Sequence, residues 1–462
     1  MAAGQGTRMK SEVPKVLHEI CGRPMVAWPI LAAREAGAGR VCVIVSADKD
    51  LSHALPDGTE TVVQPTSDGT GGAIRAAREV VASSESVLVL SGDTPLLRGE
   101  DLAGLVAAHE RAGAAATVMT TELDDPGSFG RVVRAGGGDE VEKIVEAKAD
   151  GDATLAELEI REVNVGIYVF SGPALADALE RISNDNAQEE YYLPDALPAI
   201  RDAGGTVIAH VVGDPTVNLG VNDRADLARV TLEARRRILV GHMRAGVTIE
   251  DPDSTWVDAD VELDPDVTLL PGTSLRGATA VGSGSVVGPM TTLIDSRLGR
   301  GVTVPHSYLV ECAVGDGASV GPFAYLRPGA ALGEGSKAGT FVEIKNSEIG
   351  DGAKVPHLSY IGDADVGAGA NLGAGTITAN YDGFRKHRTK VGEGVRTGVD
   401  TALIAPVEVG DGAYTGAGSV ITDDVPAGAL GIARAKQSNV DGYAQNKSEQ
   451  AEQSKPNEKG KS

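Results

Sequence analysis

Aromatic residues, cysteine and positive charge are all scarce in this chain of 462 residues. Phe, Trp and Tyr together make up 3% of the sequence, whereas glycine occurs 60 times, a balance that favours tight, repetitive turns over an aromatic-rich interior. Three scattered cysteines are typical of reduced thiols in a cytoplasmic protein. No apolar run is long enough to cross a bilayer, so membrane insertion is not expected. The formal charge of −23 argues against nucleic acid as the main partner.

The length predicts two or three domains, and the first 222 residues have the pattern of an α/β domain. The segments Val41–Val45 and Val87–Leu90 are continuous apolar runs, as expected for strands of a parallel sheet that helices cover on both faces. Helical patterns lie between them. We therefore predict a Rossmann-like nucleotidyltransferase domain over residues 1–222 and a connecting helix over residues 223–246.

The pattern changes after this helix, because aliphatic residues then recur every six positions. Val314, Val320, Leu326 and Leu332 show this period, and similar glycine-rich units follow. A six-residue period is neither helical nor alternating. It predicts a parallel β-helix of hexapeptide repeats over residues 247–440, in which each unit supplies one short strand with an inward aliphatic residue. Residues 441–462 are polar, and we predict a disordered tail.

The opening stretch, MAAGQGTRM, has the features of a phosphate-binding loop. Gly4 and Gly6 let the backbone approach an anion closely, and Arg8 and Lys15 add positive charge. The loop is not a Walker A motif, because Met9 stands where the second glycine would be, and the dinucleotide fingerprint lacks its third glycine. An ordinary turn is the alternative interpretation.

A second candidate feature is Asp93, which follows the apolar run VLVL. It is expected at the carboxyl end of the sheet, where ligands bind in α/β folds. A carboxylate beside a phosphate loop suits Mg²⁺, which prefers oxygen donors and substrate phosphates. An aspartate that caps a turn is the alternative. Gln64, Gly69 and Thr70 offer amide and backbone groups, as does Asn222 in NLGVND.

Polar residues interrupt the six-residue rhythm of the β-helix in three places. Glu343 and Lys345 come first, His357 and Tyr360 follow, and a polar loop then holds Asn380 and Tyr381. A single histidine is more often a structural hydrogen-bonding residue than a base. One coil of three repeats, however, separates this histidine from the region of Arg327, and the clustering favours a function.

Taken in chain order, these motifs resemble a known family. AAGQGTRM, PKVL, GTGGA, SGD, FGRV, IVEAK, EVNVGIY and GVND resemble the sugar-1-phosphate nucleotidylyltransferases. With the β-helix, the set resembles the bifunctional bacterial enzymes of UDP-N-acetylglucosamine synthesis, which are both N-acetylglucosamine-1-phosphate uridylyltransferases and glucosamine-1-phosphate acetyltransferases. The resemblance reaches from residue 1 to about residue 440. It implies left-handed coils packed as a homotrimer, with acetyl-transfer sites between subunits.

The resemblance also implies roles for single residues. In the first half, UTP, N-acetylglucosamine-1-phosphate and Mg²⁺ would bind; Arg8 and Lys15 would neutralise the phosphates, and Asp93 and Asn222 would hold the metal. The uridine end would contact Ala2, Ala3, Gly4, Gln64, Gly69 and Thr70, and the sugar would contact Gly130, Glu146 and Asn164.

In the second half, His357 would be the general base for transfer of the acetyl group from acetyl-CoA to glucosamine-1-phosphate. The sugar phosphate would bind Arg327, Lys345, Tyr360 and Asn371, with Glu343 orienting the amine, and acetyl-CoA would bind Ala374, Asn380, Tyr381, Ala417 and Arg434. The chain departs from the family at Val399, where a serine is common near the acetyl group.

Two rival interpretations remain. One is a nucleotidylyltransferase of other specificity whose β-helix only regulates or oligomerises. The other is a non-catalytic assembly subunit, as in translation-initiation exchange factors. Family members also carry several aliphatic residues before AAG. We therefore expect the true start to lie upstream of Met1, and we expect a chain this short to lose a central strand and its uridylyl site.

Overall fold

The computed structural model describes residues 1–4, 6–136, 138–147, 153–186 and 189–454. The chain divides into two compact units. The first comprises Met1–Leu263 together with Ser274–Thr279, and the second comprises Asp264–Thr273 together with Ala280–Ser462. The boundary therefore lies later than the predicted end of the connecting helix.

The first unit is an α/β domain built on a six-stranded sheet. The strand order is β10-β6-β9-β7-β8, and β5 pairs with β9. The main strands and helices are α1 (Ala27–Glu35), β3 (Cys42–Ser46), β4 (Glu60–Gln64), α2 (Gly69–Ala76), α3 (Arg78–Ala82), β5 (Ser86–Val89), α4 (Gly99–Ala112), β6 (Ala116–Glu122), β7 (Arg131–Arg134), β8 (Val141–Val145), α5 (Leu155–Leu158), β9 (Glu162–Ser171), α6 (Gly172–Ala178), α7 (Ala196–Asp202), β10 (Val207–Val211) and α8 (Arg224–Arg244). Short strands β1 (Glu19–Ile20), β2 (Arg23–Pro24), β11 (Thr248–Ile249), β12 (Trp256–Val257), β13 (Glu262–Leu263) and β15 (Ser274–Arg276) complete it.

The sheet is mixed, whereas the apolar runs suggested a parallel one. β6 pairs in parallel with β10, but β9 lies antiparallel to both β5 and β6. β9 returns after the antiparallel β7–β8 pair, and both of its faces are covered, since Ile167 and Phe170 are fully buried. An apolar run reports burial on both faces but not strand direction, which explains the difference.

β3 and β4 form a separate parallel pair, and the first two residues lie between β3 and β5. The Ala2 N–H donates to the Ile44 carbonyl at 2.8 Å, and the Gly92 N–H donates to the Met1 carbonyl at 2.8 Å. Among the described residues no strand joins β3 to β5. A cavity of about 390 Å³ lies there, lined by residues of both strands and by apolar side chains of the neighbouring helices.

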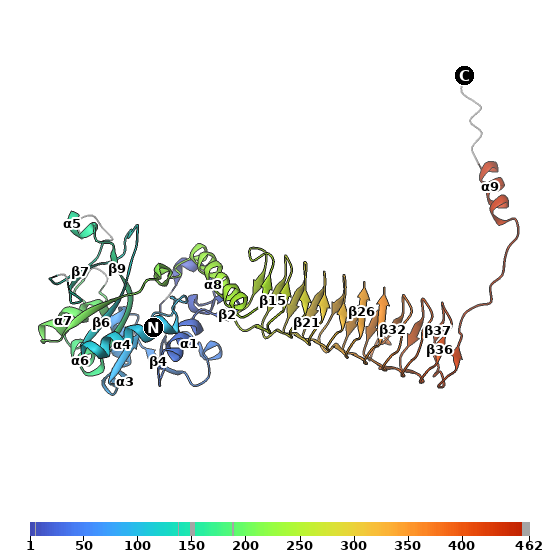
Figure 1. Cartoon of the computed structure of the whole chain (residues 1–462), viewed down its shortest axis with the longest axis horizontal. Helices are drawn as coiled ribbons and strands as arrows, with labels where there is room; N and C mark the ends of the chain where they lie inside the picture. The colour runs from blue at the N-terminus through green and yellow to red at the C-terminus, as the bar shows by residue number, and fades with distance from the viewer. Residues whose placement is uncertain (5, 137, 148–152, 187–188, 455–462) are drawn as a thin grey trace, which may run out of the picture. The chain divides into compact units, whose positions relative to one another are not determined.

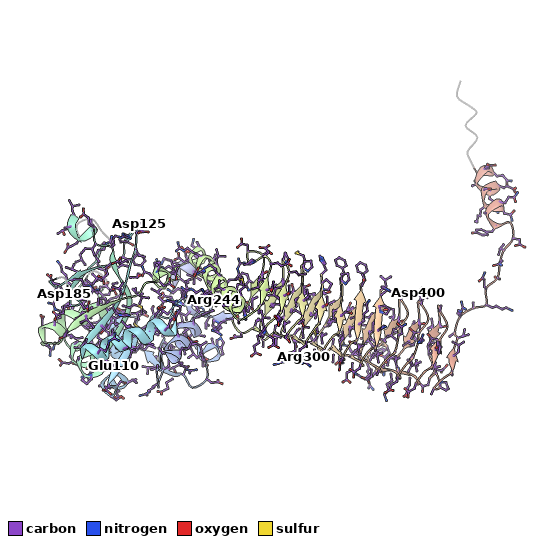
Figure 2. The ribbon with its side chains drawn as sticks, in the orientation of Figure 1. Glu110, Asp125, Asp185, Arg244, Arg300 and Asp400 are labelled. Atoms are coloured by element: carbon purple, nitrogen blue, oxygen red, sulfur yellow. The ribbon has the colours of Figure 1, made fainter. Side chains whose placement is uncertain are left out.

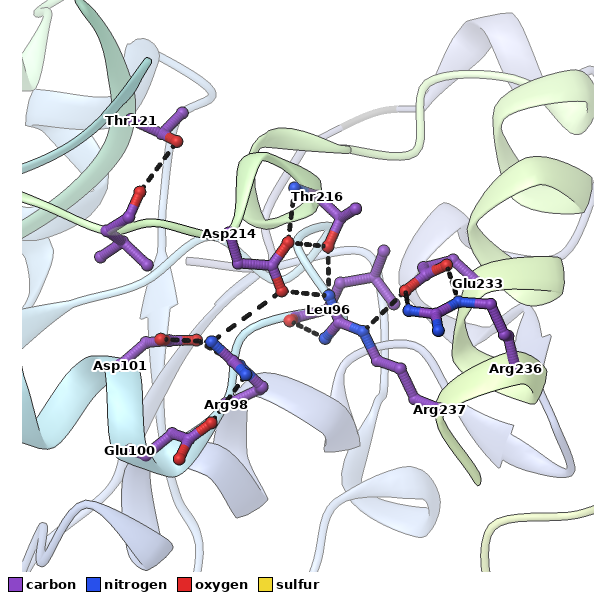
Figure 3. Close-up of polar contacts among 11 residues, drawn as sticks. Leu96, Arg98, Glu100, Asp101, Thr121, Asp214, Thr216, Glu233, Arg236 and Arg237 are labelled. Atoms are coloured by element: carbon purple, nitrogen blue, oxygen red, sulfur yellow. Dashed lines mark hydrogen bonds and ion pairs between the residues drawn. The ribbon is translucent and has the colours of Figure 1, made fainter. Parts of the chain in front are cut away.

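The predicted connecting helix is present as α8 and is fastened to the first unit. Asp223 caps its first turn through hydrogen bonds from the N–H groups of residues 225 and 226. Arg237 donates to the Leu96 carbonyl at 2.6 Å and to the Asp214 carboxylate at 3.0 Å, as Figure 3 shows. A buried side of α8 that includes Val230 packs against the unit's interior. The helix is therefore part of the first unit rather than a free linker.

The second unit is the predicted left-handed parallel β-helix (Figure 1). Its strands form three long parallel sheets, in the orders β14-β17-β20-β23-β26-β29, β18-β21-β24-β27-β30-β32-β34-β37 and β16-β19-β22-β25-β28-β31-β33-β35. The strands are β14 (Thr268–Leu269), β16 (Ala280–Val281), β17 (Val286–Val287), β18 (Thr292–Ile294), β19 (Arg297–Leu298), β20 (Thr303–Val304), β21 (Tyr308–Val310), β22 (Ala313–Val314), β23 (Ser319–Val320), β24 (Tyr325–Leu326), β25 (Ala331–Leu332), β26 (Lys337–Thr340), β27 (Glu343–Lys345), β28 (Glu348–Ile349), β29 (Lys354–His357), β30 (Tyr360–Gly362), β31 (Ala364–Val366), β32 (Ile377–Ala379), β33 (Thr389–Val391), β34 (Ala402–Ile404), β35 (Val407–Val409), β36 (Tyr414–Thr415), β37 (Val420–Ile421) and β38 (Leu430–Gly431).

The register confirms that one coil takes three six-residue units. Val314 pairs with Leu332, three units later in the chain, and both side chains point into the buried interior. Successive coils are also joined outside the strands: Arg300, which Figure 2 labels on the β-helix, pairs with Asp316 of the next coil at 3.0 Å. The terminal stretch differs from the prediction, because Tyr443–Gln453 forms the fully exposed helix α9. Residues 455–462 of the predicted tail lie outside the described residues.

Candidate active sites in the two units

The predicted phosphate loop is held against the segment that carries Lys15. Gly6 has a φ of 64°, and a Cβ placed on it would lie 2.7 Å from the Cβ of Lys15. Only glycine fits this left-handed and crowded position. The next residues, Thr7–Met9, form a short 3₁₀ turn, whose Met9 is buried. The loop glycine therefore brings the turn that carries Arg8 close to Lys15.

Lys15 and Asp93 form an ion pair at the carboxyl end of β5. The Lys15 ammonium lies 2.5 Å from Oδ2 of Asp93, and the Ser91 hydroxyl donates to Oδ1 of the same carboxylate at 2.5 Å. Burial alone would raise the pKa of Asp93, but the charge of Lys15 and the hydrogen bonds from Lys15 and Ser91 outweigh it and hold the pKa below its ordinary value. Asp93 is therefore ionised at neutral pH.

Arg8 and Asn222 form a second cation–oxygen contact beside the first. Arg8 Nη2 donates to Oδ1 of Asn222 at 2.8 Å, and the backbone N–H of Asn222 donates to Asp226 at 3.1 Å. The Val221 N–H donates to the Asp93 carbonyl at 3.0 Å, which joins the two predicted metal residues through the backbone. Both side chains offer the oxygen atoms that Mg²⁺ prefers.

The donor set suits a metal that is bound largely through substrate. The described residues contain no cluster of three or more His, Cys, Asp or Glu side chains able to hold an ion by themselves. Mg²⁺ usually binds through one or two protein oxygens together with substrate phosphates, so Asp93 and Asn222 fit that ion.

A cavity of about 1180 Å³ in the first unit brings together five of the residues predicted for this site. It is lined by Thr70, Asp93, Glu146, Asn164 and Asn222. This volume is large enough for a nucleotide and a sugar phosphate together.

The predicted sugar-binding residues meet at one side of this cavity. The Asn164 N–H donates to the Gly130 carbonyl at 2.9 Å, and a Cβ on Gly130 would lie 3.6 Å from Glu146. The side chain of Asn164 donates to the Tyr168 hydroxyl at 2.8 Å and accepts from the Gly166 N–H at 2.9 Å. Burial raises the pKa of Tyr168 to about 12, so its hydroxyl keeps its proton.

The residues predicted at the uridine end lie on neighbouring segments. Gln64 is the last residue of β4, and Gly69 and Thr70 begin α2. Gln64 donates to the Gly69 carbonyl at 3.2 Å. Ala2 and Ala3 are buried, whereas Gly4 is exposed and its carbonyl accepts from Lys49 at 3.3 Å.

In the second unit, a column of side chains on one sheet presents the predicted phosphate-binding arginine. Tyr325, Glu343 and Tyr360 are register neighbours on β24, β27 and β30. Arg327 donates to Glu343 at 2.8 Å and lies over the Tyr325 ring. The hydrogen bond with Glu343 raises the pKa of Arg327, which keeps its charge.

Lys345 lies beside a carboxylate that the sequence analysis did not select. Asp363 accepts hydrogen bonds from Lys345 at 3.3 Å, from Asn346 at 2.6 Å and from Asn380. Burial would raise the pKa of Asp363, but these three donors together lower it. The neighbouring Lys345 lowers the pKa of Lys386, and the charge of Arg327 adds to this effect. An anion bound among the three cations would relieve their repulsion.

The remaining residues of the predicted acetyl site are less closely joined. His357 ends β29, pairs in register with Thr340 and is exposed; its imidazole has no hydrogen-bond partner within the described residues. The backbone of Asn371 forms isolated parallel β-bridges with Lys354 and with Arg396. The other predicted residues of the acetyl site are Ala374, Tyr381, Ala417 and Arg434. Within the described chain, no hydrogen bond joins them to Arg327 or to the column of side chains beside it.

Tyr168, Asp226, Asp363 and Lys386 are the main polar residues of these sites that the sequence analysis missed. Asp363 and Asn380 are separated by one coil and become neighbours only through the β-helix register. The period of the repeats could have identified this pair, because residues one coil apart share a face.

The comparisons with known proteins agree with this geometry. Residues 1–193 match the family of MobA-like NTP transferase domains. The chain is 50% identical to the bifunctional protein GlmU of Paenarthrobacter aurescens over 451 residues, which cover 96% of this chain and 90% of the relative. It is 47% identical to the protein of the same name from Streptomyces coelicolor, over 97% of this chain and 93% of the relative. It is 46% identical to the protein of the same name from Mycobacterium tuberculosis, over 97% of this chain and 92% of the relative.

Within the described residues, every helix is too short or too polar to cross a bilayer.

Proposed function

The chain belongs to the family of the bifunctional protein GlmU, and from this premise we propose how its two units divide the chemistry. The chain is a uridylyltransferase and an acetyltransferase of UDP-N-acetylglucosamine synthesis, which supplies the cell wall. The first unit carries uridylyl transfer and the second carries acetyl transfer. The match of residues 1–193 to an NTP transferase domain supports this division.

In the first unit, a phosphate oxygen of N-acetylglucosamine-1-phosphate attacks the α-phosphorus of UTP and pyrophosphate leaves. No side-chain nucleophile is needed, so the residues act by positioning and by neutralising charge. Arg8 and Lys15 carry that positive charge. The observation that carries this proposal is their contact with Asn222 and Asp93 at the edge of the 1180 Å³ cavity.

Asp93 and Asn222 are the residues that would hold Mg²⁺, which when bound supplies charge neutralisation at the phosphate oxygens. The depressed pKa of Asp93 supports this role, because its carboxylate is ionised wherever the reaction runs. The uridine end of the substrate contacts Ala2, Ala3, Gly4, Gln64, Gly69 and Thr70, and the sugar contacts Gly130, Glu146 and Asn164.

In the second unit, His357 is the general base. It takes a proton from the amine of glucosamine-1-phosphate as that amine attacks the thioester of acetyl-CoA, and coenzyme A leaves as the thiol. The exposed imidazole, which has no hydrogen-bond partner among the described residues, supports this role. Arg327 and Lys345 bind the sugar phosphate, Tyr360 and Asn371 bind the sugar, and acetyl-CoA contacts Ala374, Asn380, Tyr381, Ala417 and Arg434.

The working assembly is a homotrimer of β-helices in the cytoplasm. One corner of the β-helix carries Met290, Phe323, Phe341 and Leu358, all with positive φ and all more than half exposed. Phe323 and Phe341 stack with ring centres 5.4 Å apart. An exposed apolar column of this kind on a repeat protein is typically buried when subunits associate. Dependence on UTP and acetyl-CoA supports the cytoplasmic location.

Two assays on the purified chain test the proposal. One follows pyrophosphate release from UTP and N-acetylglucosamine-1-phosphate with Mg²⁺, and the other follows free thiol from acetyl-CoA and glucosamine-1-phosphate. Both should be positive. Pyrophosphate release without thiol release would favour a nucleotidylyltransferase with a non-catalytic β-helix. It would also implicate Val399, which is half exposed and replaces a serine common in the family. Absence of both activities would indicate a non-catalytic assembly subunit.

A further inference from the structure

Gln64 is held in one orientation by two acceptors. Its side chain is 95% buried, since only 5% is exposed. Its Nε2 donates to Oδ1 of Asp68 at 2.8 Å and to the carbonyl of Gly69 at 3.2 Å. Both amide protons are therefore used within the protein. Rotating the amide by half a turn would instead bring Oε1 against a carboxylate and a carbonyl, which repel it.

The backbone around Asp68 fixes the position of this carboxylate. The Asp68 N–H donates to the Thr66 carbonyl at 2.9 Å, and its carbonyl accepts from the Tyr191 N–H at 2.8 Å. The carboxylate lies against the first turn of α2, where a Cβ on Gly72 would lie only 1.9 Å from Oδ1. Gly72 therefore makes the space that Asp68 occupies, and no other residue fits there without displacing the carboxylate.

The amide oxygen of Gln64 is left as an acceptor for a ligand. Within the described part of the chain, Oε1 has no hydrogen-bond partner. Beside it, the N–H groups of Gly69 and Thr70 begin α2, and the first N–H groups of a helix have no acceptor inside the helix. The segment thus offers one acceptor next to backbone donors. A ligand that presents a ring N–H next to a carbonyl group would match this arrangement.

We propose that Asp68 is a positioning residue that sets base preference by fixing the amide of Gln64. This rests on the proposed function, in which Gln64, Gly69 and Thr70 contact the uridine end. Uracil presents the N3–H donor between two carbonyls. Cytosine presents an N3 lone pair, which would face Oε1 with no proton between them. A free glutamine could turn and offer Nε2 to cytosine, but a glutamine held by Asp68 cannot.

The test compares UTP with CTP and with 3-methyluridine triphosphate, which lacks the N3 proton. The variants are Asp68→Asn, whose amide can present either oxygen or nitrogen to Gln64, and Asp68→Ala, which removes the acceptor. Asp57→Asn is the matched control, because it removes one exposed negative charge from the same unit. Dissociation constants with Mg²⁺ and, for UTP and CTP, kcat/KM are measured, and thermal melting verifies the fold.

The unmutated chain should prefer UTP over CTP and over the methylated nucleotide. In both Asp68 variants the preference for UTP over CTP should fall roughly tenfold, the size expected for one mismatched buried hydrogen bond. The control should keep its preference. A merely structural role for Asp68 would lower all affinities together and leave the UTP-to-CTP ratio unchanged.

The outcomes separate this inference from the proposed function. If the unmutated chain prefers UTP in binding, both Asp68 variants lose that preference and no pyrophosphate is released, uridylyl transfer is wrong and the positioning role stands. If pyrophosphate is released and both Asp68 variants keep the original UTP-to-CTP ratio, the positioning role is overturned and uridylyl transfer stands. Equal binding of UTP and CTP by the unmutated chain also overturns it.

Discussion

The ammonium of Lys15 lies 2.5 Å from the carboxylate of Asp93, although the two residues come from different segments of the first unit. The contact joins the segment behind the phosphate loop to the carboxyl end of β5. It places a cation and the best candidate for a metal ligand at one edge of the large cavity. Both residues are proposed to act on phosphate, so the pair locates the chemistry of the first unit.

Replacing Asp93 should separate the two activities. Asp93→Ala should abolish pyrophosphate release, because the phosphates of UTP lose their metal, and it should leave thiol release from acetyl-CoA within twofold of the parent. Asp57→Ala, which removes an exposed carboxylate of the same unit, should keep both activities. Loss of both activities in Asp93→Ala would mean that the two sites are not independent.

Removing Lys15 should weaken the acid dependence of the first unit's stability. The pKa of Asp93 is held below its ordinary value, so its contribution to the free energy of unfolding is complete above that ordinary value and is lost as the pH falls through the folded value. Without Lys15, burial acts with less opposition and raises this pKa. In Lys15→Met the stability at neutral pH should therefore be lower, and the further loss on acidification should be smaller than in the parent chain.

Urea denaturation between pH 3 and pH 7, followed by tryptophan fluorescence, measures this effect. Both tryptophans, Trp28 and Trp256, belong to the first unit. Arg8→Met is the control, because Arg8 contacts Asn222 and not Asp93. Equal acid sensitivity of the two variants would contradict the assignment of the shift to Lys15.

His357 should be needed only for acetyl transfer. His357→Ala removes the group that accepts the proton of the amine, and general-base catalysis contributes about a hundredfold or more. Thiol release should fall by at least that factor while pyrophosphate release is kept. His306→Ala is a control in the same unit, since the His306 ring lies tilted against that of Phe323 and has no proposed role in proton transfer. A similar loss in both variants would indicate damage to the β-helix rather than a missing base.

The β-helix was the most predictable part of the molecule, because its signal is local and repeated. Leu326 and Leu332 showed the six-residue period, and their inward burial confirms it. The direction of β9 could not be predicted, since pairing with β5 and β6 is non-local. The same limit applies to Asp363, which looks like an ordinary turn residue until the coils are stacked.

The boundary between the two compact units lies past the end of α8 for a physical reason that involves Trp256. Its ring lies under Arg276 at 4.4 Å and near Arg235 of α8 at 5.6 Å, and its Nε1 donates to Asp258 at 2.8 Å. The first coil residues therefore pack on the helix and belong to the first unit. The sequence pattern changes at residue 247, but the residues that pack against α8 extend beyond that position.

Tyr168 should matter for the sugar phosphate rather than for the nucleotide. Tyr168→Phe removes the hydroxyl that accepts from Asn164 at 2.8 Å and leaves the buried ring in place. The freed amide loses its fixed orientation, so KM for N-acetylglucosamine-1-phosphate should rise about fivefold to tenfold. KM for UTP should stay within twofold. A larger change for UTP would contradict the placement of Asn164 at the sugar.

The cavity between β3 and β5 predicts an effect of apolar residues added before Met1. The Met1 amino group donates to the Leu90 carbonyl at 2.8 Å, and burial lowers its pKa to about 6. An unfolded amino group binds its proton near pH 8, so the unfolded chain holds more protons between pH 6 and pH 8. The free energy of unfolding of the chain that starts at Met1 should therefore rise with pH across this window, by about 2 kcal/mol.

An extension of four residues, Val-Ile-Val-Leu, placed before Met1 should remove this pH dependence and raise stability throughout. It would run beside β3 and β5 and bury side chains in the 390 Å³ cavity, where each buried aliphatic side chain contributes about 1.5–3 kcal/mol. The control extension Ser-Asp-Gly-Asp also moves the amino group away but has nothing to bury. Tryptophan fluorescence in urea should show a higher midpoint for the apolar extension alone. Equal midpoints would mean that the cavity does not accept a strand.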